Sequence, residues 1–115
     1  MYALCIIIND VMKIDMIHEI LYEHHVGATT LDSRGMGRVL LNHHVEIPII
    51  GSMRKYLDGN KPYNKTIISI IKEKTKLDEV VDDIRERVAD FGEKGVGFIF
   101  VLPVIECYDL GNKNV

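Results

Sequence analysis

Apolar residues recur along the first part of the chain in two patterns, one typical of buried strands and one typical of amphipathic helices. A nearly continuous apolar run over residues 2–8 predicts a strand in the middle of a sheet. Apolar side chains at intervals of three and four residues then mark one helical face: Ile14, Ile17, Ile20 and Leu21. This spacing predicts an amphipathic helix that Asn9 or Asp10 caps and that Gly27 ends.

The second half of the chain repeats this order of elements. Residues 65–71 predict a strand, and Thr75 with Asp78 resembles the capping arrangement of a following helix. The apolar face of that helix is regular: Leu77, Val80, Val81, Ile84 and Val88. Residues 98–104 predict a last strand, where Pro103 favours a strand end or an edge position. A β-compatible stretch at 28–34 predicts a further strand, which runs into a glycine turn over 35–38.

Two such halves predict an α+β fold of the ferredoxin-like βαββαβ type. In this plan four antiparallel strands form one sheet, both helices cover one face, and a long insert follows the second strand. The length of 115 residues fits a single domain spanning residues 1–115. The strands have little hydrophilic alternation, so the uncovered face of the sheet should be apolar and should drive self-association.

Composition narrows the functional classes. A formal net charge of −3, with 14 basic and 17 acidic residues, argues against a nucleic-acid-binding protein. The apolar run at 2–8 is shorter than the roughly 20 residues of a membrane span, so we expect a cytoplasmic protein that is not an integral membrane protein. Cys5 and Cys107 are expected to be buried, reduced thiols in the two terminal strands.

Three stretches, taken in order, resemble the PII family of nitrogen-regulatory signalling proteins. They are residues 27–31 with the glycine turn 34–38, the strand and helix at 65–90, and the glycine loop and strand at 95–104. The resemblance fails mainly in the insert, residues 39–64, which takes the place of the family's T-loop. It implies a homotrimer that binds an adenine nucleotide, ATP, ADP or AMP, in clefts between subunits. The insert would then report the bound state to an unidentified target protein.

The resemblance also implies the ligand-binding residues. Glycine turns suit phosphate groups because backbone N–H groups can converge without Cβ obstruction, and an arginine adds a bidentate charge-assisted contact. Matching the family's motifs gives these positions: Thr29, Gly35, Gly37, Arg38, Gly92, Lys94, Gly95 and Gly97. Among them Thr29 matches the position that contacts the base, and Lys94 lies close enough to replace one missing cation.

The chain departs from the family where phosphate is bound. The two phosphate-facing lysines of the family fall on Glu93 and Phe98, and the arginines that follow its last strand are absent from 106–110. Each lost charge-assisted bond is worth about 1.5–3 kcal/mol, so triphosphate binding should be weak. AMP, ADP, another small anion or no ligand at all remain open. The insert lacks the family's tyrosine-centred pattern, and its apolar character predicts that part of it is ordered.

Two other functions compete with this interpretation. The histidine pairs His24-His25 and His43-His44 would allow a divalent-metal-binding trimer of the same architecture, although a metal needs three or four convergent ligands. The lost cations would also fit a structural oligomer without a ligand. No nucleophile and base stand in a catalytic pattern, so we expect no catalytic residues, no enzymatic activity and no resident metal.

Overall fold

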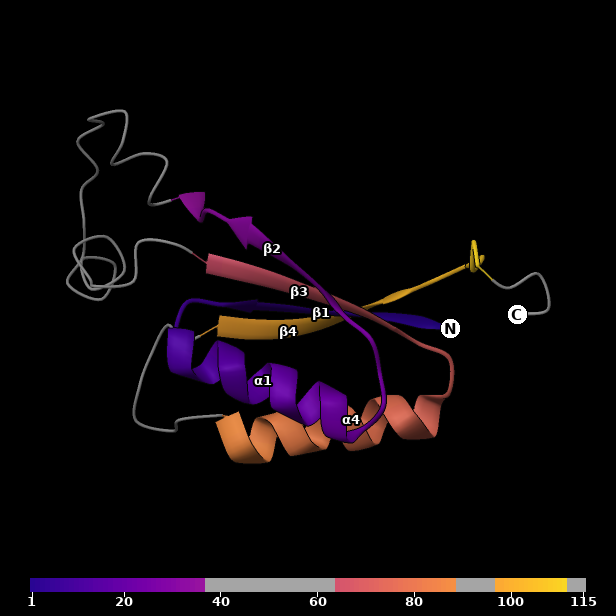
Figure 1. The fold of residues 1–115 in the computed structure, drawn as a ribbon, viewed down its shortest axis with the longest axis horizontal. Coiled ribbons are helices and arrows are strands. Elements are labelled where there is room, and N and C mark those ends of the chain that lie inside the picture. The colour runs from indigo at the N-terminus through magenta and orange to yellow at the C-terminus, as the bar shows by residue number, and fades with distance from the viewer. Residues whose placement is uncertain (37–63, 89–96, 112–115) are drawn as a thin grey trace.

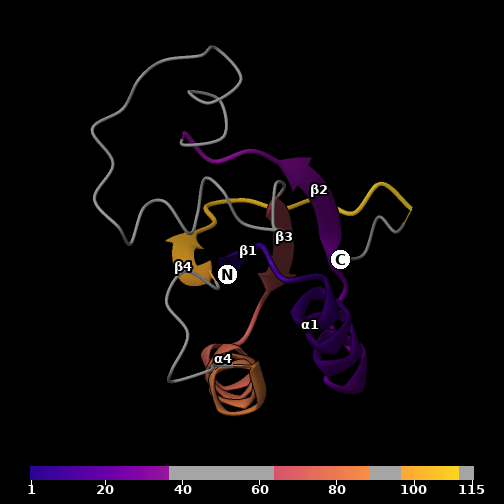
Figure 2. The ribbon, with the colours of Figure 1, turned by 90° about the vertical axis from the view of Figure 1, so that its left-hand side faces the viewer.

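A computed structural model of the protein describes residues 1–36, 64–88 and 97–111. The elements follow in the order β1 (Tyr2–Ile8), α1 (Val11–Glu23), β2 (Thr29–Ser33), β3 (Asn64–Ile71), α4 (Lys74–Val88) and β4 (Gly97–Pro103). The strands form one antiparallel sheet in the order β2-β3-β1-β4. Both helices lie against the same face of this sheet (Figure 1), and Figure 2 shows them side by side beneath it. The predicted ferredoxin-like α+β fold is confirmed.

The core lies between the helices and the two central strands. On β1, Leu4, Ile6 and Ile8 point toward the helices, and each is at most 3% exposed. Both helices bury the faces that the spacing predicts, and Val81 packs at the margin of the core. Fully buried aliphatic side chains are worth about 1.5–3 kcal/mol each, so this packing supplies most of the stability of the layer.

Helix α1 begins as expected but ends earlier. The side chain of Asp10 accepts a hydrogen bond from the backbone N–H of Met12, which confirms it as the N-cap. The prediction that Gly27 ends the helix is wrong. The helix stops at Glu23, and His25 adopts the left-handed conformation that glycine usually takes after a C-cap, with φ 58°. Gly27 instead lies in the connection to β2, where its carbonyl accepts a hydrogen bond from the buried Ser69 hydroxyl.

Two further boundaries differ from expectation. Helix α4 starts at Lys74, so Thr75 is already helical and does not cap it. Lys74 forms an ion pair with Asp78 one turn later, and this hydrogen bond raises the pKa of the lysine. Strand β3 starts at Asn64, which the sequence pattern assigns to the insert. The prediction that part of the insert is structurally ordered concerns residues that lie outside the described chain.

Strand β4 spans 97–103 and not the predicted 98–104, but it lies at the edge of the sheet and Pro103 is its last residue, in agreement with the position that the proline favours. Both cysteines are free thiols and Cys5 is buried, but the prediction for Cys107 is wrong. It lies beyond β4 in an exposed segment because the strand ends four residues before it. Within the described part of the chain, no helix has both the length and the apolar character that crossing a membrane requires.

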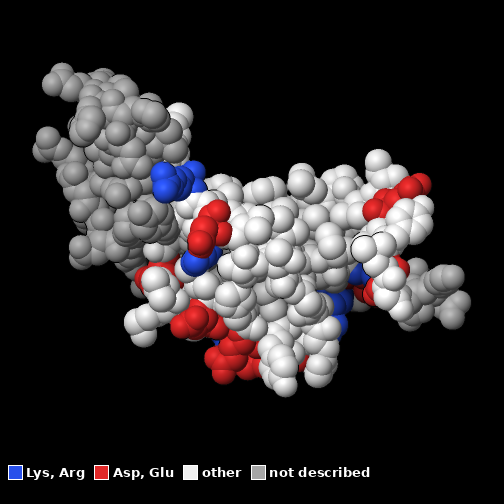
Figure 3. Space-filling model, turned by 45° about the horizontal axis from the view of Figure 1, so that its top comes forward, with Lys and Arg blue, Asp and Glu red and all other residues white. Residues whose placement is uncertain are grey.

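The face of the sheet opposite the helices has no cover from the described residues. The strand register places these side chains on it, and we refer to them as the open face: Ala3, Cys5, Ile7, Thr29, Leu31, Ser33, Asn64, Thr66, Ile68, Ile70, Phe98, Phe100 and Leu102. None of them is charged. Figure 3 shows a broad uncharged surface over the sheet with the acidic and basic residues around its margin. The expectation of an apolar uncovered face is therefore confirmed.

Candidate functional site

The predicted ligand-binding residues fall partly within the described chain. Thr29, Gly35 and Gly97 are described. The other positions, Gly37, Arg38, Gly92, Lys94 and Gly95, lie outside the described residues. The described members lie on two different strands or just beyond them, and their environments distinguish what each can do.

Gly97 is required by the packing of the sheet. It is the first residue of β4 and pairs with Ile8 at the end of β1, with φ 155°. A Cβ at this position would meet the backbone oxygen of Ile7 at 2.1 Å, far inside van der Waals contact. The glycine therefore lets β4 begin directly against β1. This role needs no ligand.

Gly35 has a different environment. Among the described residues, a Cβ there would meet only the side-chain amide of Asn64, at an ordinary 3.4 Å. The described part of the chain therefore gives no steric reason for a glycine at this position, and no positive φ requires one. Gly35 follows β2, at the end of the sheet where β3 begins.

Thr29 is the first residue of β2 and lies opposite Ile68 on the open face. Its side chain is exposed, and its strand is the edge opposite to β4. Thr30, the next residue, points to the helix side, where its hydroxyl forms a 2.6 Å hydrogen bond with His18 Nε2. Thr29 is thus free to face a molecule or a second chain that covers the open face.

A single subunit does not bring these positions together. Gly35 follows one edge strand and Gly97 begins the other, and two strands lie between them. At about 4.8 Å per strand spacing, the edges are separated by about 14 Å. Both glycines nevertheless lie at the same end of the sheet, because the C-terminal end of β2 and the N-terminal end of β4 lie there (Figure 1). A site that uses both would have to form where the β2 edge of one copy meets the β4 edge of another.

Phe98 occupies a position where the resembling family has a phosphate-facing lysine. Its ring is 60% exposed on the open face and stacks against Phe100, with 6.0 Å between ring centroids. An exposed aromatic pair attracts an apolar or aromatic surface and not a phosphate. The Phe98 side chain therefore offers no charge-assisted contact to a phosphate group at this edge.

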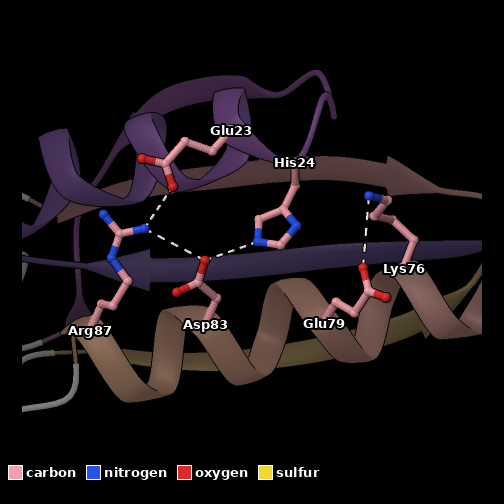
Figure 4. Close-up of polar contacts among 6 residues, drawn as sticks. All are labelled: Glu23, His24, Lys76, Glu79, Asp83 and Arg87. Carbon is pink, nitrogen blue, oxygen red and sulfur yellow. Dashed lines mark hydrogen bonds and ion pairs between the residues drawn. The ribbon is translucent and has the colours of Figure 1, made fainter.

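A polar cluster that the sequence pattern does not reveal joins the two helices (Figure 4). His24 Nε2 lies 2.9 Å from Asp83 Oδ2, and Arg87 Nη1 lies 2.7 Å from Glu23 Oε2 and 3.5 Å from the same Asp83 oxygen. The hydrogen bond to Glu23 raises the pKa of the Arg87 guanidinium. Asp83 and Arg87 are one turn apart on α4, so the end of α1 is tied to α4 by side chains about 60 residues away in sequence.

We expect the His24–Asp83 contact to stabilise the packing of the helices. Replacing either residue by alanine should lower the free energy of unfolding by about 0.5–1.5 kcal/mol, since both side chains are mostly buried. Urea denaturation of the two single variants and of the double variant would measure the coupling. The exposed Lys76–Glu79 pair, at 3.8 Å, is the matched control and should contribute less than about 0.5 kcal/mol. Fully additive losses at His24 and Asp83 would contradict a direct interaction.

Metal binding by the histidine pairs finds no support in the described residues. No group of three or more histidine, cysteine, aspartate or glutamate side chains gathers into a metal site within residues 1–36, 64–88 and 97–111. His18 contacts Thr30, and His24 contacts Asp83. The second pair, His43 and His44, lies outside the described residues.

Comparison with known proteins identifies the fold. No family model matches the chain, and a search of curated proteins finds no match. Among solved structures, the chain is similar to the crystal structure of PII from Arabidopsis thaliana bound to citrate. The two share 23% sequence identity with a TM-score of 0.64, over 97% of this chain and 84% of the plant protein. At this level of identity the likeness establishes a PII-like fold, which agrees with the resemblance of the motifs.

Proposed function

We propose that this chain is a PII-like regulatory protein that works without enzymatic activity. It assembles as a homotrimer, binds a small effector in clefts between subunits, and regulates a target protein through residues 39–64. The placement of Gly35 and Gly97 carries the proposal most directly. They lie at one end of the sheet but at opposite edges, so copies arranged edge to edge would bring them together.

Two further observations support assembly. The open face is uncharged, and several of its large apolar side chains are substantially exposed: Leu31, Ile70, Phe98 and Leu102. A contiguous apolar surface of this kind marks an interaction site in a soluble protein. The resemblance of the motifs to the PII family, which implies a homotrimer, favours a second copy as the partner.

The proposed effector is a small anion, with an adenine nucleotide as the leading candidate. The similar plant protein was solved with citrate bound, which supports an anionic ligand without fixing its kind. Phe98 and Glu93 replace cations of the resembling family, so we expect AMP or ADP to be preferred over ATP. Binding can alter residues 39–64 only if the effector has different affinities for the alternative states of that segment.

The test combines calorimetric titration with hydrogen exchange. ATP, ADP, AMP and citrate would each be titrated, and exchange of residues 39–64 would be compared with and without ligand. We expect at least one ligand to bind and to slow exchange in this segment. Arg38→Ala should weaken that binding about 10–100-fold, the equivalent of one charge-assisted contact of about 1.5–3 kcal/mol.

The matched control is Arg85→Ala, which removes an exposed arginine from α4 and should leave binding unchanged. An assembled protein that responds to none of the four ligands would favour a structural oligomer over a sensor. Zinc binding without a nucleotide response would favour the metal-binding alternative. Unchanged affinity and unchanged exchange in Arg38→Ala would remove that residue from the site.

A further inference from the structure

The side of α1 that points away from the sheet exposes apolar side chains that the core does not use. Val11 is 72% exposed, Met12 is 77% exposed and Tyr22 is 82% exposed. Helical periodicity places them on one side together with two exposed carboxylates, and we call these five residues the outer face of α1: Val11, Met12, Asp15, Glu19 and Tyr22. The face is about 16 Å long, at about 1.5 Å per residue. No described element covers it (Figure 2).

Helix α4, which is described over its whole length, exposes no large apolar side chain. Its exposed residues carry both signs of charge, apart from one threonine: Lys74, Thr75, Asp78, Glu79, Asp82, Arg85, Glu86 and Arg87. Valine has a lower helix propensity than the residues that usually fill exposed helical positions, so helix formation does not account for Val11. Single exposed apolar residues are ordinary on a protein surface, but three on one helical face indicate a contact surface.

The charge on the outer face of α1 has one sign. Asp15 and Glu19 are one helical turn apart, and neither forms an ion pair within the part of the chain that the structure describes. Lys13 is half-buried and lies on another side of the helix. His18 borders the face, and its Nε2 is hydrogen-bonded to the Thr30 hydroxyl. The face is therefore both apolar and acidic.

This combination selects a partner by charge. Two copies of the outer face would bring carboxylates against carboxylates, which argues against pairing of α1 with itself. The phosphate groups of anionic lipids and nucleic acids would be repelled for the same reason. A basic amphipathic helix is complementary, because lysines or arginines beside its apolar stripe can pair with Asp15 and Glu19.

We infer that the outer face of α1 binds a basic amphipathic helix of a partner protein. The apolar stripe of that helix packs against Val11, Met12 and Tyr22, and its flanking cations pair with the two carboxylates. This surface belongs to the helical layer and shares no residue with the open face or with residues 39–64. The inference therefore goes beyond the proposed function, and it requires neither a trimer nor an effector.

A synthetic helix of about 18 residues, or five turns, provides the probe. It has leucine at every third and fourth position and lysine at the flanking positions, and fluorescence anisotropy would measure its binding to the protein. One control peptide has glutamate in place of every lysine, and a second has serine in place of every leucine. We expect the leucine–lysine peptide to bind at least about tenfold more tightly than either control. No binding at millimolar peptide, or equal binding of either control, would overturn the inference.

Charge reversal locates the binding surface. Asp15→Lys with Glu19→Lys should weaken binding of the leucine–lysine peptide at least about tenfold and should allow the leucine–glutamate peptide to bind. The matched control, Asp82→Lys with Glu86→Lys, makes the same change of charge at exposed positions one turn apart on α4 and should keep the affinity within about threefold. Circular dichroism would verify that both variants are folded. Unchanged affinity in the α1 variant, or equal loss in both variants, would overturn the inference.

The apolar part of the surface has its own variant. Val11→Ser with Tyr22→Ser keeps both carboxylates and should weaken binding of the leucine–lysine peptide at least about tenfold, because contact with its leucines is lost. Unchanged affinity would reduce the contact to charge alone and would contradict the packing of an amphipathic helix. Any of these failures would leave the proposed assembly and effector binding untouched.

Discussion

If the chain assembles through its open face as proposed, Ile70→Glu should yield monomers that remain folded. Ile70 lies on the open face near the C-terminal end of the central strand β3, opposite Ala3 of β1, and its side chain is 41% exposed within a single copy. A glutamate there can stay hydrated in the monomer, but assembly would bury its charge against apolar neighbours. An uncompensated buried charge costs several kcal/mol, and about 3 kcal/mol already weakens association more than 100-fold. Sedimentation velocity over a range of concentrations would measure the change.

Tyr22→Glu is the matched control for this prediction. Tyr22 is 82% exposed on α1, so the substitution adds the same charge to the opposite layer of the protein. It should leave the assembly unchanged. If both variants assemble as the wild type does, the open face is not the interface. If both dissociate, the effect comes from net charge and not from the position of the substitution.

Gly97→Ala should destabilise each copy by at least about 2 kcal/mol. The conformation at φ 155° is unfavourable for an L-residue by about 1–3 kcal/mol, and the new Cβ would also overlap the Ile7 carbonyl. Relief requires β4 to move away from β1, because the overlapping atom belongs to the backbone and cannot rotate aside. Urea denaturation monitored by circular dichroism would measure the decrease in the free energy of unfolding.

Two other glycines provide controls for Gly97→Ala. A Cβ at Gly27 meets nothing within 4 Å, and one at Gly35 makes only an ordinary contact. Gly27→Ala and Gly35→Ala should therefore change the free energy of unfolding by less than about 1 kcal/mol. If Gly35→Ala abolished nucleotide binding but left the free energy of unfolding unchanged, Gly35 would belong to the ligand site. Equal losses of stability at all three glycines would contradict the steric argument for Gly97.

Periodicity identified the elements of this fold because each element buries one side. The spacing from Ile14 to Leu21 marks the buried face of α1, and the run at 2–8 marks a strand with neighbours on both edges. The residues that end a helix were harder to predict from the sequence. The left-handed position after α1 is held by His25, which tolerates it, whereas the glycine two residues later has another role. A glycine in sequence does not reveal which residue takes the positive φ.

The candidate site was harder to predict, since its arrangement depends on contacts between distant segments. The motifs assign Gly35 and Gly97 to one ligand site, but only the strand order shows that they occupy opposite edges of the sheet. The His24–Asp83–Arg87 cluster joins residues about 60 positions apart, and no spacing rule connects them. The apolar residues near Cys107 predict a strand, whereas in the structure they belong to an exposed segment that follows β4.

The position of β1 has a consequence for how the chain acquires its structure. Its two neighbours in the sheet are β3 and β4, both from the second half of the sequence, and β2 does not pair with it. While the ribosome makes the first half, the apolar residues 2–8 have no strand to pair with. Closing such long sequence separations is slow compared with local helix formation. The nascent chain therefore presents an unprotected aggregation-prone segment until β3 has been synthesised, a stage at which a chaperone would have a substrate to bind.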